Sequence, residues 1–210
     1  MPRNSARSRM LPTDRRTQIL SAARRMLEHK AIDDISVEAV AGEAGVSPAL
    51  LFHYFGSQRK FRYAVLQMAA EELLSHVRPD PALSIAEQLR AGVETFVDYV
   101  SRFPTVYVAV TRLGRGTDVR ELHSSARGAI GGWITEGIES VGVELTPTLR
   151  LTVNAWLAFM EEAVLGWLAR PELTKAELID MCERSFYRLA EGALDDEERW
   201  QEIAALLNRR

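Results

Sequence analysis

Apolar residues recur at intervals of three and four along almost the whole chain of 210 residues, a spacing that predicts α-helices. Between Asp14 and Lys30, for example, one helix face carries an apolar row made of Ile19, Ala22, Ala23, Met26 and Leu27. No segment shows the strict alternation of apolar and polar residues that is typical of a half-buried strand. The sequence therefore predicts an all-α protein.

Capping residues and helix breakers divide this pattern into ten expected helices. After the first helix, Ser36 is the expected N-cap of a second helix that ends near Ala44, and Ser47 begins a short third helix that ends near Phe55. The segments 84–87 and 174–177 have the spacing of capping boxes. Asp118 is the expected cap of the seventh helix. The later helices are expected at about 57–77, 84–103, 104–113, 118–141, 146–170, 174–194 and 196–207.

Residues 36–55, SVEAVAGEAGVSPALLFHYF, combine two short helices with a tight turn. Gly45 supplies a residue that tolerates a positive φ in that turn, and Pro48 occupies the favoured first position of the next helix. A unit of this kind places the N-terminal half of its second helix in the major groove of DNA. His53 and Tyr54 on that helix can donate hydrogen bonds to phosphate oxygens. The segment therefore predicts DNA binding.

Charge is distributed unevenly along the chain. Residues 1–62 hold eleven Lys and Arg against six Asp and Glu, a net charge of +5, whereas the remainder carries −8. A basic segment followed by an acidic one is typical of a protein whose N-terminal part faces phosphates. For Arg3, Arg7 and Arg9 two interpretations stay open, a flexible basic arm that strengthens DNA binding or a solvated tail.

Three motifs, ILSAARRML, ISVEAVAGEAGVS and HYFGSQRKF, together resemble the TetR family of bacterial transcription regulators over about residues 12–72. The resemblance implies an all-α homodimer, normally a repressor, that binds a near-palindromic operator and is released by a small ligand. We accordingly expect a flexible basic arm (1–12), a three-helix helix-turn-helix DNA-binding domain (13–60) and a helical effector-binding and dimerisation domain (61–210). The family's DNA contacts correspond to Ser36, Ser47, Pro48, Ala49, Leu50, Phe52, His53 and Tyr54.

Two positions on the expected third helix, which would enter the major groove, depart from the family pattern. Leu50 stands where Thr is common and Phe52 where Tyr is usual, and neither side chain can form a hydrogen bond. We therefore expect base recognition to rely on apolar contact with thymine methyl groups. Phosphate binding is then expected to rely on His53, Tyr54 and Lys60.

Most aromatic residues lie beyond residue 60, in the region that encloses the ligand in the TetR family. A cavity lined by such residues would favour an apolar or aromatic effector. Glu161 and Glu162 lie in an otherwise apolar helix, and whether either faces inward stays open. The glycines 128, 131 and 132 allow either close helix packing or a bend. The expected ligand-binding residues are Phe96, Tyr99, Phe103, Tyr107, Trp133, Trp156, Phe159, Met160 and Glu162.

The resemblance also implies a dimer interface, because the eighth and ninth helices of the family pack as a four-helix bundle across a two-fold axis. The expected interface residues are Ala163, Val164, Trp167, Leu178, Met181, Phe186 and Leu189. The expected partners are thus an operator DNA, a second copy of the chain and a small effector. An activator with the same fold, or a regulator without a small-molecule effector, is the alternative.

The sequence does not indicate an enzyme. It lacks the Glu-x-x-His pairs of di-iron bundles, and one cysteine with four scattered histidines gives no zinc-binding spacing. We expect no catalytic residue, metal or cofactor. Because no apolar run approaches the roughly 18 residues of a membrane span and no secretory signal is recognisable, we expect a cytoplasmic protein with no membrane partner.

Overall fold

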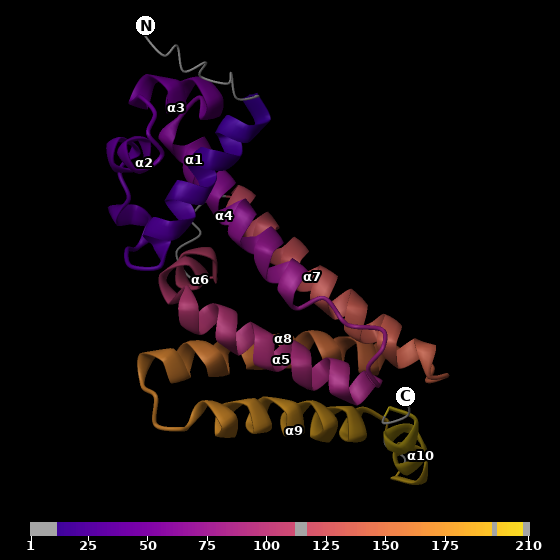
Figure 1. Cartoon of the computed structure of the whole chain (residues 1–210). Helices are drawn as coiled ribbons and strands as arrows, with labels where there is room; N and C mark the ends of the chain where they lie inside the picture. Colours follow the sequence, from indigo (N-terminus) through magenta and orange to yellow (C-terminus); the bar gives the residue numbers. More distant parts are fainter. Residues whose placement is uncertain (1–11, 112–116, 195–196, 208–210) are drawn as a thin grey trace, which may run out of the picture. The chain divides into compact units, whose positions relative to one another are not determined.

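The computed structural model describes residues 12–111, 117–194 and 197–207. These residues form α-helices and one 3-10 turn, Ile32–Asp34, with no β-strand among them (Figure 1). The helices of the described residues are α1 (Pro12–Leu27), α2 (Val37–Glu43), α3 (Pro48–Phe55), α4 (Gln58–His76), α5 (Ile85–Arg102), α6 (Pro104–Thr111), α7 (Thr117–Ser140), α8 (Pro147–Ala169), α9 (Lys175–Leu194) and α10 (Glu197–Leu207). The prediction of an all-α fold is confirmed.

The chain divides into two compact units, Met1–Ala69 and Ala70–Arg210, and the division falls within α4. We call them the head unit and the body unit. The sequence predicts the boundary at residues 60–61, nearer to the start of the same helix. Of the predicted basic arm, Pro12 begins α1, and 1–11 lie outside the described residues.

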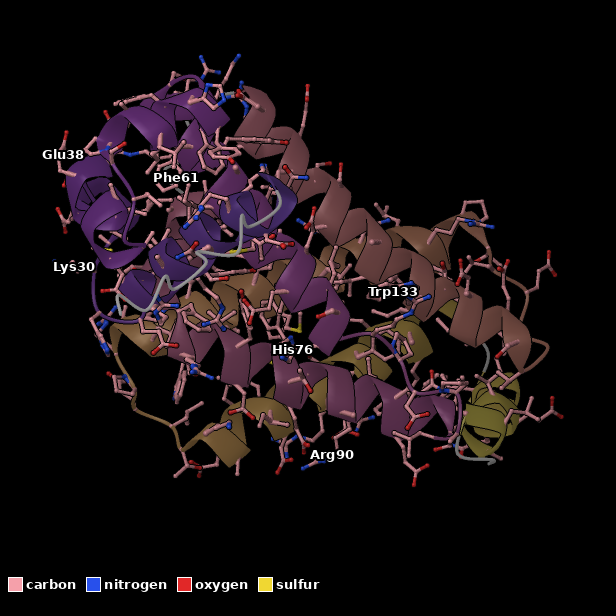
Figure 2. All side chains as sticks on the ribbon, turned by 45° about the horizontal axis from the view of Figure 1, so that its top comes forward. Lys30, Glu38, Phe61, His76, Arg90 and Trp133 are labelled. Carbon is pink, nitrogen blue, oxygen red and sulfur yellow. The ribbon has the colours of Figure 1, made fainter. Side chains whose placement is uncertain are left out.

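The head unit has its own apolar core, formed where α1, α2 and α3 pack together. Phe61 of α4 completes this core with 2% of its surface exposed, whereas Glu38 of α2 is exposed (Figure 2). α1 ends three residues before the predicted Lys30, because the N–H groups of Glu28 and His29 bond to the carbonyls three residues back, of Arg25 and Met26, at 3.3 and 3.1 Å, and not to those four residues back. The buried apolar residues of α1, α2 and α3 are Ile19, Leu20, Ala22, Ala23, Leu27, Val37, Val40, Ala41, Leu51 and Phe55.

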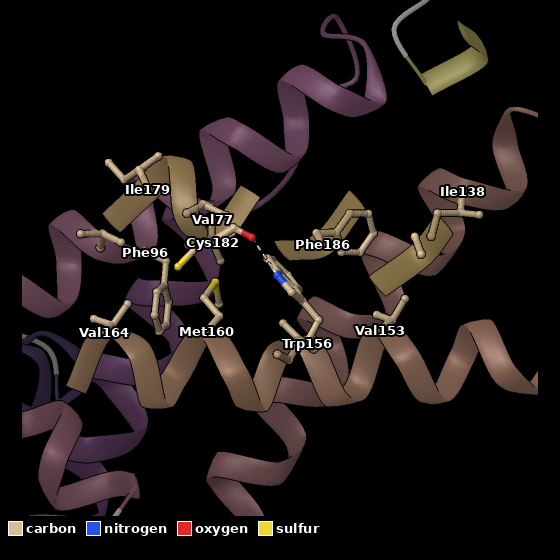
Figure 3. Close-up of a cluster of buried hydrophobic side chains, with 14 of the residues drawn as sticks. Val77, Phe96, Ile138, Val153, Trp156, Met160, Val164, Ile179, Cys182 and Phe186 are labelled. Carbon is tan, nitrogen blue, oxygen red and sulfur yellow. Dashed lines mark hydrogen bonds between the residues drawn. The ribbon is translucent and has the colours of Figure 1, made fainter. Parts of the chain in front are cut away.

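The body unit has a larger core, which receives side chains from all of its described helices, α4 to α10. Trp156 of α8 is 1% exposed, and its ring packs edge-on against Phe186 of α9 with ring centroids 5.0 Å apart (Figure 3). The indole N–H of Trp156 donates to the carbonyl of Cys182 at 2.9 Å. This hydrogen bond satisfies a buried donor, so the ring lies in the core without an orphaned polar atom.

Hydrogen bonds at the helix N-termini confirm both predicted capping boxes. Ser84 and Glu87 exchange side-chain and backbone hydrogen bonds at the start of α5. Thr174 and Glu177 exchange the same bonds at the start of α9. α7 begins one residue earlier than predicted, so Asp118 lies in its first turn and the prediction of a cap at this position is wrong.

Among the α7 glycines 128, 131 and 132, Gly131 marks a close contact between helices. A Cβ atom at Gly131 would lie 3.3 Å from the Leu157 side chain and 3.8 Å from that of Asn154, both on α8. A Cβ atom at Gly128 or Gly132 would meet no atom within 4 Å. At Gly131 the structure thus favours close packing of α7 against α8.

Neither a membrane-spanning helix nor a metal-binding group of side chains is found in the part of the chain that the structure describes. No helix there is both long enough and apolar enough to cross a membrane. No group of three or more His, Cys, Asp or Glu side chains there could hold a metal ion.

Candidate nucleic-acid interface and ligand cavity

The turn between α2 and α3 has the geometry that the sequence predicts. Ser36 caps α2 and Ser47 caps α3, each accepting a hydrogen bond from the backbone N–H three residues later (3.1 and 3.2 Å). Gly45 has a φ of 65°, in the left-handed region that glycine adopts without strain. The N–H of Val46 donates to the carbonyl of Ala41 at 2.9 Å, which closes the end of α2. These contacts fix the direction in which α3 leaves the turn.

α3 has a buried face and an exposed face. Leu51 is 0% exposed and Phe55 is 6% exposed, so these two side chains anchor the helix in the core of the head unit. Phe52 is 42% exposed, although it is a large apolar ring. The other residues of the exposed face are Pro48, Ala49 and His53, with Leu50 and Tyr54 half-buried beside them. α3 therefore presents to solvent a surface that carries no Lys, Arg, Asp or Glu.

All nine predicted DNA-binding residues belong to the head unit. Seven are exposed, and Leu50 and Tyr54 are half-buried. Gly56, with a φ of 77°, ends α3 and allows α4 to begin two residues later, with Lys60 exposed in its first turn. Backbone N–H groups at the start of α3 and the ammonium of Lys60 favour an anion such as a phosphate. That these residues contact DNA stays a prediction.

A cavity of about 70 Å³ lies within the body unit. Five aromatic rings line it, those of Phe96, Trp133, Trp156, Phe186 and Tyr187. Aliphatic side chains complete the wall, among them Val77, Ile85, Leu89, Ile130, Ile134 and Leu207. None of the described residues that line it is charged. The cavity is therefore suited to an apolar ligand.

Four of the nine predicted ligand-binding residues line this cavity, namely Phe96, Trp133, Trp156 and Met160. Tyr99, Phe103 and Tyr107 do not. The rings of Tyr99 and Phe103 pack on each other with centroids 5.1 Å apart, and Tyr107 packs edge-on against Phe96 at 5.4 Å. These three aromatic side chains thus belong to the packing around α5 and α6 and not to the cavity wall.

The remaining two predicted ligand-binding residues, Phe159 and Glu162, are corrected by the structure. Phe159 is 39% exposed, and Glu162 is exposed as well. Successive residues of a helix point about 100° apart, so Phe159 cannot share the direction of its neighbour Met160, which lines the cavity. α8 therefore turns Phe159 and Glu162 away from the cavity.

The aliphatic part of the cavity wall is missing from the predicted residues, although the sequence contains a signal for it. Ile130, Ile134 and Ile138 recur every four residues along α7, and Ile85 and Leu89 have the same spacing on α5. Residues with that spacing share one face of a helix. The predictions favour aromatic residues and therefore overlook this row.

Glu161 is the carboxylate of α8 that faces the interior. Its side chain is 17% exposed and accepts a hydrogen bond from Nε2 of His123 at 3.0 Å, with the guanidinium of Arg127 at 3.5 Å. Burial, and secondarily the charge of Glu161, raises the pKa of the Tyr107 hydroxyl well above its usual value. The pairing with α7 explains how a carboxylate is tolerated at a partly buried position of an apolar helix.

Three predicted dimer residues lie in the core of a single chain, and the prediction is wrong for them. Val164 is 0%, Leu178 1% and Phe186 4% exposed, because α8 and α9 pack against each other within the chain. Of the other four, Leu189 is 43% exposed. The half-buried ones are Ala163, Trp167 and Met181.

α8 nevertheless keeps an exposed apolar face. Leu151 is 70% and Phe159 39% exposed, and Ala155 and Ala158 are exposed between them. Positions 151, 155, 158 and 159 lie on one side of a helix because they are spaced by three and four residues.

Comparisons of the sequence with known proteins point to one family. Residues 19–64 match the family model described as "Bacterial regulatory proteins, tetR family". The HTH-type transcriptional activator FasR of Mycolicibacterium smegmatis is 34% identical over 97 residues, which are 45% of this chain and 44% of that protein. The HTH-type transcriptional regulator BetI of Brucella anthropi is 41% identical over 59 residues, 28% of this chain and 30% of that protein. The chain thus aligns with less than half the length of these curated relatives.

Solved structures extend the similarity to most of the chain. A tetR-family transcriptional regulator from Streptomyces coelicolor superposes with a TM-score of 0.80 at 26% identity, covering 94% of this chain and 88% of that one. The fatty acid degradation regulator FadR from Bacillus halodurans shares the fold, with a TM-score of 0.63 at 17% identity over 87% of this chain and 97% of that one. These relatives are named as transcription regulators, in agreement with the prediction that the chain is not an enzyme.

Proposed function

This chain belongs to the tetR family of bacterial regulatory proteins, and we propose that it regulates transcription by binding an operator in double-stranded DNA. The observation that carries the proposal is the division of α3, whose Leu51 and Phe55 are held in the core while Ala49 and Phe52 point to solvent. Two short helices joined by a tight turn present such a helix to the major groove. A protein that binds a bacterial operator acts in the cytoplasm, which is the location we propose.

Phosphate contacts are proposed to position α3 on the DNA. His53 is exposed and Tyr54 half-buried at the end of the helix, with Lys60 exposed beyond them. The net charge of +5 over residues 1–62 supports attraction of this part of the chain to DNA. Contacts of this kind fix the orientation of a protein on a duplex but carry no sequence information.

A second copy of the chain is the proposed occupant of the exposed apolar face of α8. Leu151 and Phe159 would lose solvent contact there, and the small side chains of Ala155 and Ala158 would allow two helices to approach closely. A two-fold dimer presents two reading helices about 34–36 Å apart, one turn of DNA, which explains why operators of such proteins are near-palindromic. The half-buried Trp167 and the exposed Leu189 remain candidates for the same interface.

The dimer proposal is tested by light scattering of the full chain after size exclusion. Leu151→Glu combined with Phe159→Glu places two carboxylates in the proposed interface and should convert the dimer to monomers. Ser124→Glu is the control, because it adds a carboxylate at an exposed position of α7. A dimer that survives the double substitution would place the interface elsewhere.

Release from DNA by a small apolar or aromatic effector is the proposed mode of regulation, with the protein acting as a repressor. α4 begins in the head unit and ends one residue before Val77, which lines the cavity. A ligand that displaces this part of the cavity wall can therefore act on the DNA-binding helix α3 through α4, which is a single continuous helix. Small displacements suffice, since two half-sites must match the spacing of successive major grooves.

An activator with the same fold is the second candidate function. It is supported by the name of FasR, the transcriptional activator with 34% identity over 97 residues. A reporter gene behind the natural promoter distinguishes the two functions. Deletion of the protein raises expression if it is a repressor and lowers expression if it is an activator.

Selection of bound sequences from a random duplex pool tests the DNA-binding proposal directly. The purified full chain should enrich a palindrome, and the affinity should fall as salt is raised. Tyr54→Ala should weaken binding to all sequences similarly, whereas changes at Ala49 should alter the preferred sequence. No enrichment by a folded, dimeric protein, with or without added effector, would overturn the proposal.

A further inference from the structure

The chemistry of the cavity wall in the body unit restricts the charge of the ligand. Every described lining residue is uncharged, and the polar ones are few. The amide nitrogen of Gln88 is already committed to the carbonyl of Leu83 at 2.8 Å, and the indole N–H of Trp156 to that of Cys182. A buried charge with no counter-charge or hydrogen-bond partner is strongly disfavoured. An ionised ligand group therefore has no counter-charge within this wall.

A second hollow, which shares Ala86 and Tyr187 with the cavity wall, disfavours anions further. It is lined by Glu87, Arg90 and Glu183, together with Trp200 and Ala204. Arg90 is its described cationic side chain, and it is already paired with Glu183 at 2.5 Å, with Asp180 at 3.0 Å and with Glu94 at 3.1 Å. The carboxylates around this hollow thus outnumber the guanidinium. An anionic head group that reached out of the cavity would meet net negative charge.

The aromatic rings of the wall favour an aromatic ligand. Trp156 and Phe186 already adopt an edge-to-face arrangement, and the half-buried Trp133 and Tyr187 line the same space. Such pairs are more favourable than their buried area alone predicts. The volume of about 70 Å³ is smaller than the roughly 150 Å³ of a closed cavity that holds benzene, so a ligand with fused rings must extend from the cavity through its opening.

Tyr187 lines both the cavity and the second hollow, and its hydroxyl is a hydrogen-bonding group. Its hydroxyl forms no hydrogen bond with any other residue that the structure describes, and burial, with a smaller effect from Glu183, raises its pKa to about 12. The hydroxyl therefore stays protonated at neutral pH and can donate to a ligand oxygen. A ligand should therefore carry a neutral polar group in addition to an aromatic ring.

Resting on the proposed function, in which this cavity binds the effector, we infer that the effector is an uncharged aromatic molecule of one or two fused rings, with a neutral polar substituent that bonds to Tyr187. Carboxylates and phosphates of similar size are disfavoured both by the uncharged wall and by the carboxylates of the second hollow, whereas ammonium compounds are disfavoured by the uncharged wall alone. The proposed effectors are thereby reduced from apolar or aromatic molecules in general to uncharged aromatic ones.

Three naphthalene derivatives with one ring system test this inference by calorimetric titration of the full chain without DNA at pH 7. 2-Naphthol is uncharged, 2-naphthoate is an anion and 2-naphthylmethylamine is a cation. We expect one 2-naphthol per chain, and binding of both ions at least about tenfold weaker, a difference of about 1.4 kcal/mol. An ion that binds as tightly as 2-naphthol, or a protein that binds none of the three, overturns the inference.

A cavity-filling variant shows whether the probe occupies this cavity. Gly92 lines the wall, and a Cβ atom there would meet no atom within 4 Å, so Gly92→Val projects into open space. Gly192→Val is the matched control, at an exposed glycine of α9 that also has open space around it. We expect Gly92→Val to weaken 2-naphthol binding at least about tenfold and Gly192→Val to leave it unchanged. Equal binding by both variants overturns the inference.

Tyr187→Phe tests the hydrogen bond. The variant should bind unsubstituted naphthalene as the original protein does, but should bind 2-naphthol about fivefold more weakly, as expected for loss of one hydrogen bond. Unchanged 2-naphthol binding would overturn the role of Tyr187. Release of the selected operator duplex is measured separately. A protein that binds 2-naphthol but keeps its DNA contradicts effector release and not the ligand class, and a protein that binds no DNA contradicts the proposed regulator alone.

Discussion

The head unit and the body unit use their apolar residues differently. In the head unit, residues 36–55 contain the turn, both serine caps and the exposed face of α3. In the body unit, the cavity wall draws on residues from Val77 to Leu207, and five of its side chains are aromatic. The candidate reading surface is thus a local property of the sequence, whereas the cavity exists because helices distant in the sequence fail to fill the space between them.

Removal of the central ring of the body core has the largest expected effect. Trp156→Ala deletes a side chain that is 1% exposed and leaves the Cys182 carbonyl with one hydrogen bond fewer, so the free energy of unfolding should fall by about 3–5 kcal/mol. Trp133→Ala, at a half-buried position of the cavity wall, should cost less. Urea unfolding of the three proteins measures both effects.

Hydrogen exchange of the same variants tests whether the two cores are separate. If they are, Trp156→Ala should accelerate exchange in α8 and α9 and leave the protection of residues 36–55 unchanged. Faster exchange in both units would show that one cooperative core serves the whole chain.

Substitutions at two adjacent residues of α3 should affect two different properties, the stability of the protein and its binding to DNA. Leu51→Ala should lower the free energy of unfolding by about 2–5 kcal/mol, since Leu51 is 0% exposed. Phe52→Ala should change it by less than about 0.5 kcal/mol, because Phe52 is 42% exposed, but should weaken operator binding about tenfold. Thermal unfolding and a DNA titration measure the two quantities. An equal loss of stability in both variants would contradict the two-faced description of α3.

The sequence predicts the head unit well because local chemistry determines it. A serine that can cap a helix, a glycine with positive φ and a proline at the first helical position act within a few residues, as Ser47, Gly45 and Pro48 do here. The predicted helix, the buried Leu51 and the exposed Ala49 all follow from that segment. No long-range information is required for them.

The cavity and the interface are predicted less well for a physical reason. Helical periodicity places Met160 and Val164 on one face of α8, but it does not reveal which neighbouring helix covers that face. Val164 is covered by the chain itself, and Phe159, one residue from Met160, is exposed. The family resemblance predicts Phe186 at the interface, but its side chain is buried and lines the cavity. Burial depends on the packing partner, which the sequence pattern does not name.

The stability of the protein at alkaline pH tests whether water reaches the core of the body unit. Burial raises the pKa of the Cys182 thiol from an ordinary 9.0 to about 11. Because the folded state holds this proton more tightly, its contribution to stability is complete below pH 9 and is lost as the pH rises towards 11. At pH 10 the loss is about 1.4 kcal/mol.

Urea unfolding at pH 8 and pH 10 measures this loss, with Cys182→Ala as the comparison. The variant lacks the thiol and should lose about 1.4 kcal/mol less between the two pH values than the original protein. Tyr187, whose pKa burial and Glu183 raise to about 12 from an ordinary 10.0, contributes above pH 10 in both proteins. An identical decrease in both would mean that water reaches the thiol in the folded state.

The smallest expected effect concerns single methyl groups of the operator. α3 carries no Arg, Lys, Asn or Gln, the side chains that read guanine and adenine through paired hydrogen bonds. The exposed Ala49 and Phe52 can instead contact the methyl group of thymine. Replacing a contacted thymine of the selected duplex by deoxyuridine removes that methyl group, and should weaken binding about fourfold, equivalent to about 0.8 kcal/mol.

A double substitution cycle assigns each methyl group to its side chain. With the Phe52→Ala protein, the deoxyuridine effect should disappear at the thymine that Phe52 contacts and persist at the thymine that Ala49 contacts. Leu173→Ala is the control, because it removes an exposed apolar side chain from the body unit, outside the proposed dimer interface, and should leave every deoxyuridine effect in place. If no thymine of the operator shows an effect, the exposed face of α3 does not read methyl groups, and the base contacts must come from His53 or from outside this helix.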